Sequence, residues 1–310
     1  MKITVKSSRY YFSPVLLILS VLFSCDSQKK ESELDEVYLN SLSSYRETLA
    51  EKSRMEYLQL IGRYQLFPDQ QNYIGTRPDK AIMVEYEDFP EELGMVHFTP
   101  DSLIFVSAGF LFETADGSSD STVQLPRTGW FRSEDYQYGR FSWHFLNREG
   151  NFFLRIRDHE HPEAMNFKGY HWFEPNAEFI LDGEFIYFDQ PLIEEVPSTL
   201  DFKENSVFIG QVKFNYRDET YTLDVGEEGF TTFADETSAD QTYGAGRYLY
   251  ITLPEKNGPV QVDFNYAYNP ACIFSEFTTC KFAPPQNRLP FKILAGELSD
   301  PIDTGMAGVH

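Results

Sequence analysis

Alternation of apolar and polar residues with a period of two is the feature that most constrains the fold of this chain. It recurs in 139–145, 153–157, 184–188, 210–216, 221–225 and 248–252. Successive side chains of a β-strand point to opposite faces of the sheet, so this period indicates strands with one buried face. The intervening segments carry no long helical pattern, which argues against strand–helix–strand units. The sequence therefore predicts a mainly β fold of antiparallel strands, either a β-sandwich or a barrel-like pair of sheets.

Short polar stretches are expected to turn the chain between these strands. Thr99-Pro100-Asp101-Ser102 has proline at a favoured turn position and separates two apolar runs. The segments 139–157 and 210–225 each alternate, cross a polar stretch and alternate again, which is typical of a β-hairpin. Their likeness fits either an internal duplication or the general likeness of hairpins.

One helix is expected ahead of the strands, at 33–56. Apolar residues recur at intervals of three to five, at Leu34, Val37, Leu42, Tyr45 and Leu49. This spacing lines one face of an α-helix. Too few heptads are present for a coiled coil, so we expect the stripe to pack on the β domain.

Residues 1–24 have the features of a secretory signal. Three basic residues precede an apolar run at 14–23 that is too short to span a bilayer as a helix. Leu22-Phe23-Ser24-Cys25 resembles the lipobox of bacterial lipoproteins, which implies lipidation of Cys25. The alternative is a secreted protein with a coincidental cysteine. The first interpretation predicts a polar tether at 25–32 and a lipid-anchored protein of the cell envelope, facing the periplasm or the outside.

The chain is strongly acidic, with a net charge of −22 that becomes −25 once the three basic residues of 1–24 are removed. Such a surface repels phosphate backbones, so no nucleic-acid partner is expected. Anionic lipid is repelled as well, so contact with the membrane is expected through the lipid anchor only. The aromatic content of 16% favours strands and a large core. The sequence contains no Gly-x-Ser-x-Gly, Walker or dinucleotide motif, and no cofactor is predicted.

Two cysteines remain if Cys25 is lipidated. Cys272 and Cys280 lie close together in the sequence, and an oxidising envelope compartment favours a disulfide between them. The alternative is a pair of reduced, buried thiols.

The C-terminal stretch holds the most specific motifs. They are Asp263-Phe264-Asn265, Ala267-Tyr268-Asn269-Pro270 with Cys272, Thr279-Cys280, Pro284-Pro285, Asn287-Arg288-Leu289 and Ala295-Gly296-Glu297. In these motifs the chain resembles a family of bacterial secreted proteins and lipoproteins, domain of unknown function 1684. The resemblance spans 57–297 and implies one β domain at 57–298, and we expect 299–310 to be a flexible tail. Ala271 and Gln286 depart from the family pattern, and the family implies no reaction.

The same stretch is the best candidate for a ligand pocket. Asp263 and Asn265 share one face of an extended strand, and Asn287 and Arg288 follow a Pro-Pro break. Carboxylate, amide and guanidinium groups beside tyrosine rings are the mixture that small-molecule sites use. The predicted ligand-binding residues are Asp263, Asn265, Tyr268, Asn269, Asn287, Arg288, Arg157, Asp158 and Arg247. The alternative is that these groups satisfy loop backbone, or that Arg288 pairs with Asp263.

Two weaker patterns suggest chemistry. His159 and His161 would share one side of a strand and supply two zinc ligands, although Pro162 ends that strand. Asp235 and Glu236 are paired carboxylates of the kind that general acid–base catalysis uses. Unrelated surface histidines and solvated loop carboxylates are the respective alternatives.

These observations leave three hypotheses of different classes. The first is an envelope lipoprotein that binds a small ligand or a protein partner through an aromatic and polar pocket near Asp263–Arg288. The second is a hydrolase, with or without a metal ion, that uses Asp263 or the group Asp158, His159 and His161. The third is a purely structural module.

Overall fold

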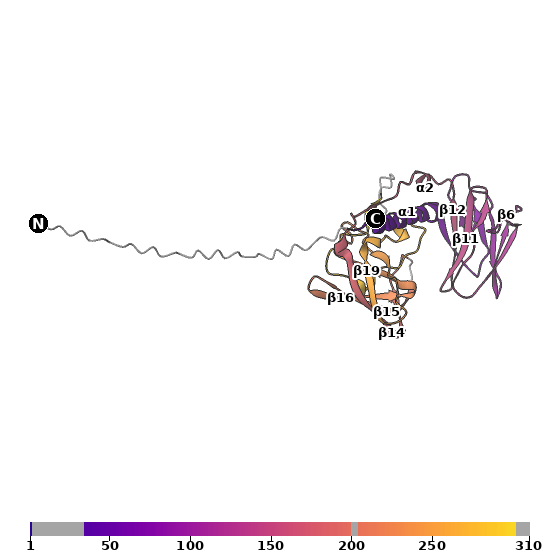
Figure 1. Cartoon of the computed structure of the whole chain (residues 1–310). Coiled ribbons are helices and arrows are strands. Elements are labelled where there is room, and N and C mark those ends of the chain that lie inside the picture. The colour runs from indigo at the N-terminus through magenta and orange to yellow at the C-terminus, as the bar shows by residue number, and fades with distance from the viewer. Residues whose placement is uncertain (2–33, 200–203, 302–310) are drawn as a thin grey trace. The chain divides into compact units, whose positions relative to one another are not determined.

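The structure is a computed structural model that describes Met1 and residues 34–199 and 204–301 (Figure 1). The predicted signal, the tether at 25–32 and Cys25 lie outside the described residues. Within the described part of the chain, no helix is long and apolar enough to cross a membrane.

The predicted helix forms as α1 (Glu36–Glu56). Asp35 caps it, because its side chain accepts a hydrogen bond from the Tyr38 backbone N–H at 2.8 Å. Leu42 of the predicted stripe is buried, but Val37 is 79% exposed, and Tyr38 turns toward the domain in its place. The expected position of Val37 is therefore wrong: Tyr38 lies four residues before the buried Leu42, about one helical turn, whereas Val37 lies five residues before it.

The N-terminal half forms two sheets. The first has the order β3 (Ile82–Met83), β2 (Asn72–Gly75), β4 (Gly94–Phe98), β5 (Ser102–Ser107), β8 (Thr122–Pro126). The second has the order β1 (Leu60–Leu66), β12 (Asn151–Asp158), β11 (Phe141–Arg148), β10 (Tyr136–Tyr138), β6 (Phe112–Glu113), β7 (Ser119–Asp120), and β9 (Phe131–Arg132) also pairs with β11. The β2–β3 pair is parallel and the others are antiparallel.

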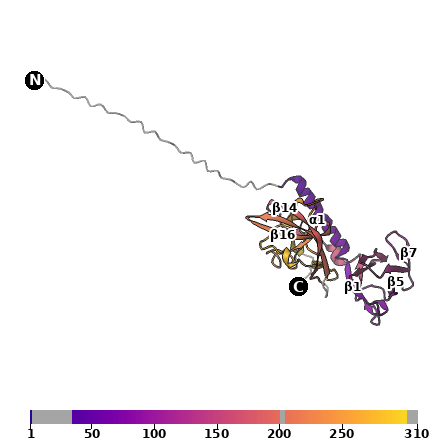
Figure 2. The ribbon, with the colours of Figure 1, turned by 90° about the horizontal axis from the view of Figure 1, so that it is seen from below.

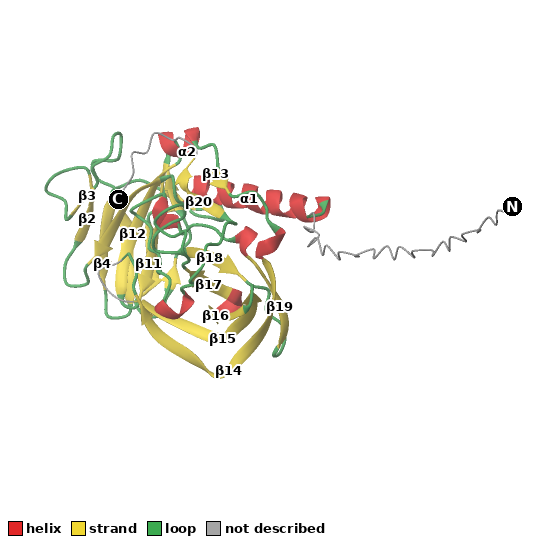
Figure 3. Ribbon diagram, turned by 90° about the vertical axis from the view of Figure 1, so that its left-hand side faces the viewer, coloured by secondary structure: helices red, strands yellow, loops and turns green. Residues whose placement is uncertain are grey.

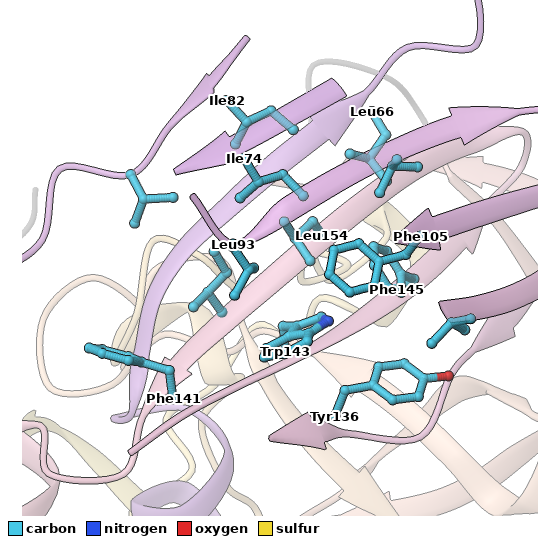
Figure 4. Close-up of a cluster of buried hydrophobic side chains, with 14 of the residues drawn as sticks. Leu66, Ile74, Ile82, Leu93, Phe105, Tyr136, Phe141, Trp143, Phe145 and Leu154 are labelled. Atoms are coloured by element: carbon cyan, nitrogen blue, oxygen red, sulfur yellow. The ribbon is translucent and has the colours of Figure 1, made fainter. Parts of the chain in front are cut away.

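One hydrophobic core joins these two sheets. Figure 4 shows Trp143 and Phe145 of β11 near Phe105 of β5, with Ile74 of β2 in the same cluster. The Trp143 and Phe105 rings meet edge to face with 5.6 Å between their centroids. The two sheets therefore pack face to face, as the sandwich prediction requires.

The β11–β12 hairpin positions the candidate site. Its two-residue turn is Glu149-Gly150, with φ of 52° and 84°, a conformation that matches the twist of the flanking strands. Alternation along β12 sends Leu154 and its neighbours of the same parity into the core. Arg155 and Arg157 therefore project from the opposite face of the sheet.

The C-terminal half forms three more sheets and several short helices (Figure 3). Four strands run in the order β16 (Glu219–Gly226), β15 (Glu204–Tyr216), β14 (Ile180–Val196), β19 (Gly258–Asp263). Two smaller pairs are β17 (Phe230–Phe233) with β18 (Arg247–Tyr250), and β13 (Tyr170–Trp172) with β20 (Glu297–Pro301). The helices are α2 (Pro162–Asn166), η1 (Ala177–Phe179), η2 (Glu227–Gly229), η3 (Phe264–Tyr266), η4 (Ala271–Ile273) and η5 (Pro285–Asn287).

A second core, which includes Phe185, Phe214, Phe233 and Phe264, fills the C-terminal half. Both cores belong to one compact unit, and in the described residues no sheet closes on itself. The mainly β, antiparallel prediction is confirmed. The predicted tail needs a correction, because 299–301 form the end of β20, where strand pairing with β13 orders them.

Helix α1 connects the two halves. Figures 1 and 2 show it lying along the C-terminal sheets and leading into β1. Near its start, the Tyr38 hydroxyl donates to Asp263 at 2.8 Å, and Tyr45 donates to the Tyr266 carbonyl at 3.0 Å. At its end, the Glu56 carbonyl accepts from Arg157 of β12 at 3.1 Å.

Candidate functional site

A cavity of about 350 Å³ lies between the end of α1, the outer face of the seven-stranded sheet and the C-terminal stretch. Lys52 and Glu56 of α1 contribute to one wall, and part of the segment 268–280 contributes to another. The volume is that of a site for a small organic molecule.

Four arginines form the sheet wall of this cavity. They are Arg132, Arg148, Arg155 and Arg157, from β9, β11 and β12. The antiparallel register places His144 opposite Arg155 and Ser142 opposite Arg157 on the same face. With Lys52, five cations line the cavity against two carboxylates, Glu56 and Glu297, in a chain whose net charge is −22. The cavity is therefore a positive region in an acidic protein.

Two carboxylates neutralise three of these arginines. Asp135 lies 2.7 Å from Arg157 and 3.0 Å from Arg132, and Glu204 lies 3.1 Å from Arg148. Burial opposes ionisation of Asp135, but hydrogen bonds from His144 and Arg132 and the charge of Arg157 hold its pKa well below its usual value. Asp135 thus stays ionised and fixes the two guanidinium groups.

Arg155 has no such partner. Among the described residues, no carboxylate lies within 4.0 Å of its guanidinium, which donates to Thr279 Oγ1 at 3.2 Å and keeps a buried Nε–H without an acceptor. Burial, followed by repulsion from Arg148, Arg63 and Arg157, lowers the pKa of Arg155 to about 9. A desolvated cation among like charges is costly unless an anion compensates it. A carboxylate or phosphate group would meet an uncompensated positive charge here.

Aromatic rings from the C-terminal half also line the cavity. Tyr250 and Tyr268 are stacked with an interplanar angle of 6° and 6.5 Å between centroids, and Phe230 meets Tyr248 edge to face at 5.0 Å. All four line the cavity. They offer a flat apolar surface to the organic part of a ligand.

Glu297, the first residue of β20, also lines the cavity. One carboxylate oxygen accepts from the Asn269 backbone N–H at 2.9 Å, while the other is buried without a partner among the described residues. Gly296 makes this turn possible, because it has a φ of 84° and a Cβ there would lie 2.6 Å from the Ala267 carbonyl oxygen. Burial raises the pKa of Glu297 to about 8, although hydrogen bonds from Asn269 and the charge of Arg247 oppose the rise.

The Glu297 carboxyl predicts a pH dependence of stability. Its pKa is higher in the folded chain than the usual 4.5, so the folded state holds the extra proton between these values and stability falls as pH rises toward 8. Between pH 5.5 and 7.5 this single proton contributes a slope of at most about 1.4 kcal/mol per pH unit. We expect the unfolding free energy of Glu297→Gln, relative to the wild type, to rise with pH over this range in urea titrations. Parallel pH profiles of the two proteins would contradict the assignment.

The predicted ligand-binding residues fall into two groups: some line the cavity, and the others lie away from it. Arg157, Tyr268 and Asn269 line the cavity. Asp263 accepts from Tyr38 and from the backbone and side chain of Asn265, and Asn265 in turn bonds both backbone groups of Asn176. These two side chains are thus used within the fold, as the alternative interpretation of the motif proposed.

The remaining predicted residues lie away from the cavity. Asn287 is buried and bonded to backbone, and Arg247 is buried in an ion pair with Asp235. The Arg288 side chain is exposed and makes no hydrogen bond or ion pair within the described residues, so the pairing with Asp263 that was the alternative to ligand binding is not formed. Asp158 is buried and contacts Tyr86 at 2.9 Å and Arg140 at 3.3 Å.

The histidines do not converge on a metal site. Among the described residues, no group of three or more histidine, cysteine, aspartate or glutamate side chains is arranged to hold a metal ion. His161 stacks on Tyr86 with 6.2 Å between centroids, and burial first, then the charge of Arg157, lowers the pKa of His159. Of the carboxylate pair, Asp235 is buried and Glu236 is exposed.

Cys272 and Cys280 are free thiols in the structure, so the predicted disulfide is not formed there. The Cys272 backbone N–H donates to Cys280 Sγ at 3.0 Å, and the Tyr243 hydroxyl lies 3.6 Å from Cys272 Sγ. Hydrogen bonding therefore accounts for the proximity of the two residues, and Cys280 lines the cavity.

Sequence reasoning missed Arg155, Arg148, Arg132 and Glu297 as cavity residues. One signal was available: arginines at two of the three outward positions of the alternating segment 153–157 put two cations on one face of a strand. Nothing in the sequence shows that this face is covered rather than solvated.

Comparisons with known proteins found a family match for part of the chain. Residues 165–298 match the family model described as "Protein of unknown function (DUF1684)". No curated protein matches the chain. Among solved structures, the chain is similar to the solution NMR structure of an uncharacterized protein from Haloarcula marismortui, at 24% identity and a TM-score of 0.36, over 43% of this chain and 78% of that one. The resemblance expected from the sequence motifs spanned residues 57–297. The family model matches a shorter part of the chain, residues 165–298.

Proposed function

We propose that this protein binds a small organic anion in the cavity, with Arg155 as the principal contact. The observation that carries the proposal is a partly buried guanidinium that has no carboxylate partner among the described residues and lies beside three other arginines at a cavity of about 350 Å³. A carboxylate or phosphate group would pair with Arg155, and the tyrosine wall would cover the apolar part of the ligand.

The other hypotheses draw less support. A hydrolase using Asp263 or Asp158 would need a carboxylate free to reach a substrate, and both are engaged in hydrogen bonds within the fold. A purely structural module gains nothing from an arginine that is partly buried among like charges with no carboxylate partner among the described residues, because such a group costs stability.

The test is Arg155→Met, which keeps the length of the side chain and removes its charge. Isothermal titration with butanoate, hexanoate, octanoate and the matching alkyl phosphates measures affinity, and hexanamide serves as the uncharged probe. We expect binding of at least one anion to the wild type and a loss of about 10–100-fold in the variant, which is the contribution of one charge-assisted hydrogen bond. Arg155→Lys is expected to retain part of the affinity.

Stability distinguishes a binding arginine from a structural one. The ligand-free Arg155→Met protein is expected to be as thermostable as the wild type or more so, because a desolvated charge has been removed. The matched control is Arg127→Met, since Arg127 lies outside the cavity and donates to the Thr99 carbonyl. A variant that loses several degrees of Tm while anion affinity is unchanged, or a wild type that binds none of the probes, would overturn the proposal.

We also propose that the protein acts in the cell envelope, anchored through lipid on Cys25. The support is the basic and apolar pattern of 1–24 followed by Leu22-Phe23-Ser24-Cys25. Because acyl chains provide the only expected attachment, Cys25→Ala should move the protein from the membrane fraction to the soluble fraction in cell fractionation. A Cys25→Ala protein that still sediments with membranes would contradict the anchor, whereas Cys272→Ala should leave the distribution unchanged.

A further inference from the structure

The four arginines of the cavity carry more positive charge than their ion pairs compensate. Asp135 lies 2.7 Å from Arg157 and 3.0 Å from Arg132, so one negative charge faces two positive ones. Glu204 lies 3.1 Å from Arg148 and compensates that single charge. The fourth arginine has no carboxylate within 4.0 Å in the described part of the chain. Counted as charge rather than as contacts, two carboxylates stand against four arginines, which leaves two positive charges in excess.

The other charged side chains that line the cavity leave this balance unchanged. Lys52 and Glu56 carry opposite charges, lie four residues apart on α1 and are both exposed. Burial raises the pKa of Glu297 to about 8, so its carboxyl is mostly protonated at pH 7. On the neighbouring strand β1, Arg63 lies opposite Arg155 in the register and repels it. The excess of two charges therefore persists at neutral pH.

The arginine wall can direct this excess charge at one ligand group. Arg148 and Arg155 lie on the paired strands β11 and β12, and both side chains line the cavity. Arg155 also keeps a buried Nε–H that no acceptor among the described residues uses. A guanidinium offers its donors as a planar fork that matches carboxylate and phosphate oxygens. A ligand group with one charge would compensate half of the excess, whereas a group with two charges would compensate all of it.

We propose that the charged group of the ligand is dianionic, either a phosphate monoester or a malonate-type dicarboxylate, and that it pairs with Arg155. This inference rests on the proposed anion site and specifies the class of its ligand. A phosphate monoester carries nearly two negative charges at pH 7.5, because its second pKa is about 6. Fatty acids and phosphodiesters carry one charge and belong to the class that the site should bind less well.

The first experiment varies the charge of the ligand at constant chain length. Hexyl phosphate, hexylmalonate, hexyl methyl phosphate and hexanoate are titrated into the wild-type protein by calorimetry at pH 7.5 and low ionic strength. Methylation of the phosphate keeps the phosphorus group and removes one charge. We expect at least one of the two dianions to bind about 10-fold or more tightly than both monoanions, because an additional charge-assisted hydrogen bond contributes this much. The tighter dianion identifies the headgroup.

The second experiment supplies a negative charge from the chain itself. Thr279 Oγ1 accepts from Arg155 at 3.2 Å, so the carboxylate of Thr279→Asp should pair with this guanidinium and reduce the excess from two charges to one. The preference for dianions should then fall to less than about 3-fold. Thr279→Asn is the matched neutral variant and should keep a preference of about 10-fold. The Tm of Thr279→Asp should equal or exceed that of Thr279→Asn, because the new carboxylate compensates a partly buried charge.

The results distinguish this inference from the proposed function. If the wild type binds none of the four probes, the proposed function fails and the dianionic ligand with it. If the wild type binds monoanions as tightly as both dianions, the anion site stands and the dianionic ligand is refuted. A Thr279→Asp protein that keeps the full preference for dianions would likewise overturn this inference alone, because the excess charge at Arg155 would then have no part in the selection.

Discussion

Replacement of Asp235 by alanine is expected to lower the free energy of unfolding by about 3–5 kcal/mol, which is the usual effect of breaking a buried ion pair from one side. The Asp235 and Arg247 side chains are both fully buried and lie 3.1 Å apart. Asp235 also accepts from the backbone N–H of Ile293 at 2.8 Å and of Thr237 at 3.2 Å. Its carboxylate therefore ties β18 to the C-terminal segment as well as neutralising a charge.

Most of the expected loss in the free energy of unfolding comes from Arg247, which stays buried with its charge. Arg247 would keep its hydrogen bonds to the carbonyls of Ala295 and Ile293 but would lose its only carboxylate partner among the described residues. Urea denaturation at pH 7 measures the loss. The double variant Asp235→Leu, Arg247→Met should recover part of it, since an apolar pair of similar volume removes the uncompensated charge.

A matched control for this prediction is an exposed ion pair in the same half of the protein. Asp240 lies 3.8 Å from Lys292, and both side chains are more than half exposed. Asp240→Ala should change the free energy of unfolding by less than about 1 kcal/mol, because solvent screens such pairs. A similar loss for the buried and the exposed aspartate would show that the Asp235–Arg247 pair has no special role.

Asn287→Ala is expected to lower the free energy of unfolding by about 2–4 kcal/mol, because buried backbone groups lose their hydrogen-bond partners. Asn287 is fully buried, accepts from the Asp224 N–H at 2.7 Å, and donates to the Asp224 carbonyl at 2.9 Å and the Thr232 carbonyl at 2.9 Å. One amide group thus bridges β16 and β17, and alanine offers no replacement for any of these bonds.

Amide hydrogen exchange gives this prediction a local readout. The Asp224 N–H should lose protection in Asn287→Ala beyond the loss that the global change in stability explains. The neighbouring Gln286→Ala is the control, because Gln286 is exposed and its side chain donates to carboxylates rather than to backbone groups, to Glu194 at 2.6 Å and to Asp224 Oδ2 at 3.2 Å. We expect the control to stay within about 0.5 kcal/mol of the wild type. Unchanged protection of Asp224 in Asn287→Ala would contradict the bridging role.

The C-terminal motifs contain residues that hold the fold together and residues that line the cavity. Asn287 and Asp263 belong to motifs of the family resemblance, and each is used to hold backbone or another side chain of the fold. Asn269 and Glu297 belong to other motifs of the same set and line the cavity. Residue type alone cannot separate these uses, because a carboxylate or amide bonds a backbone N–H as readily as a ligand.

The helix illustrates a smaller limit of sequence patterns. The spacing predicted α1 correctly, but two apolar stripes compatible with it differ only in whether Val37 or Tyr38 faces inward. The hydrogen bond from Tyr38 to Asp263, 225 residues away in the chain, accompanies the second choice. A contact between residues so distant in the chain leaves no trace in a local period.

The sequence by itself determined the mainly β, antiparallel architecture, the N-terminal helix and the two hairpins, because side-chain alternation and helical spacing are local properties of a strand or helix. It also placed Arg155 and Arg157 on one face of a strand. Only the tertiary structure decided that α1 and the C-terminal stretch cover this face and that Glu297 joins the cavity lining. It also decided that carboxylates pair with three of the arginines, while Arg155 has none among the described residues. This face is covered by segments 101 and 124 residues away in the chain, at Glu56 and Thr279, and no local pattern reports such contacts.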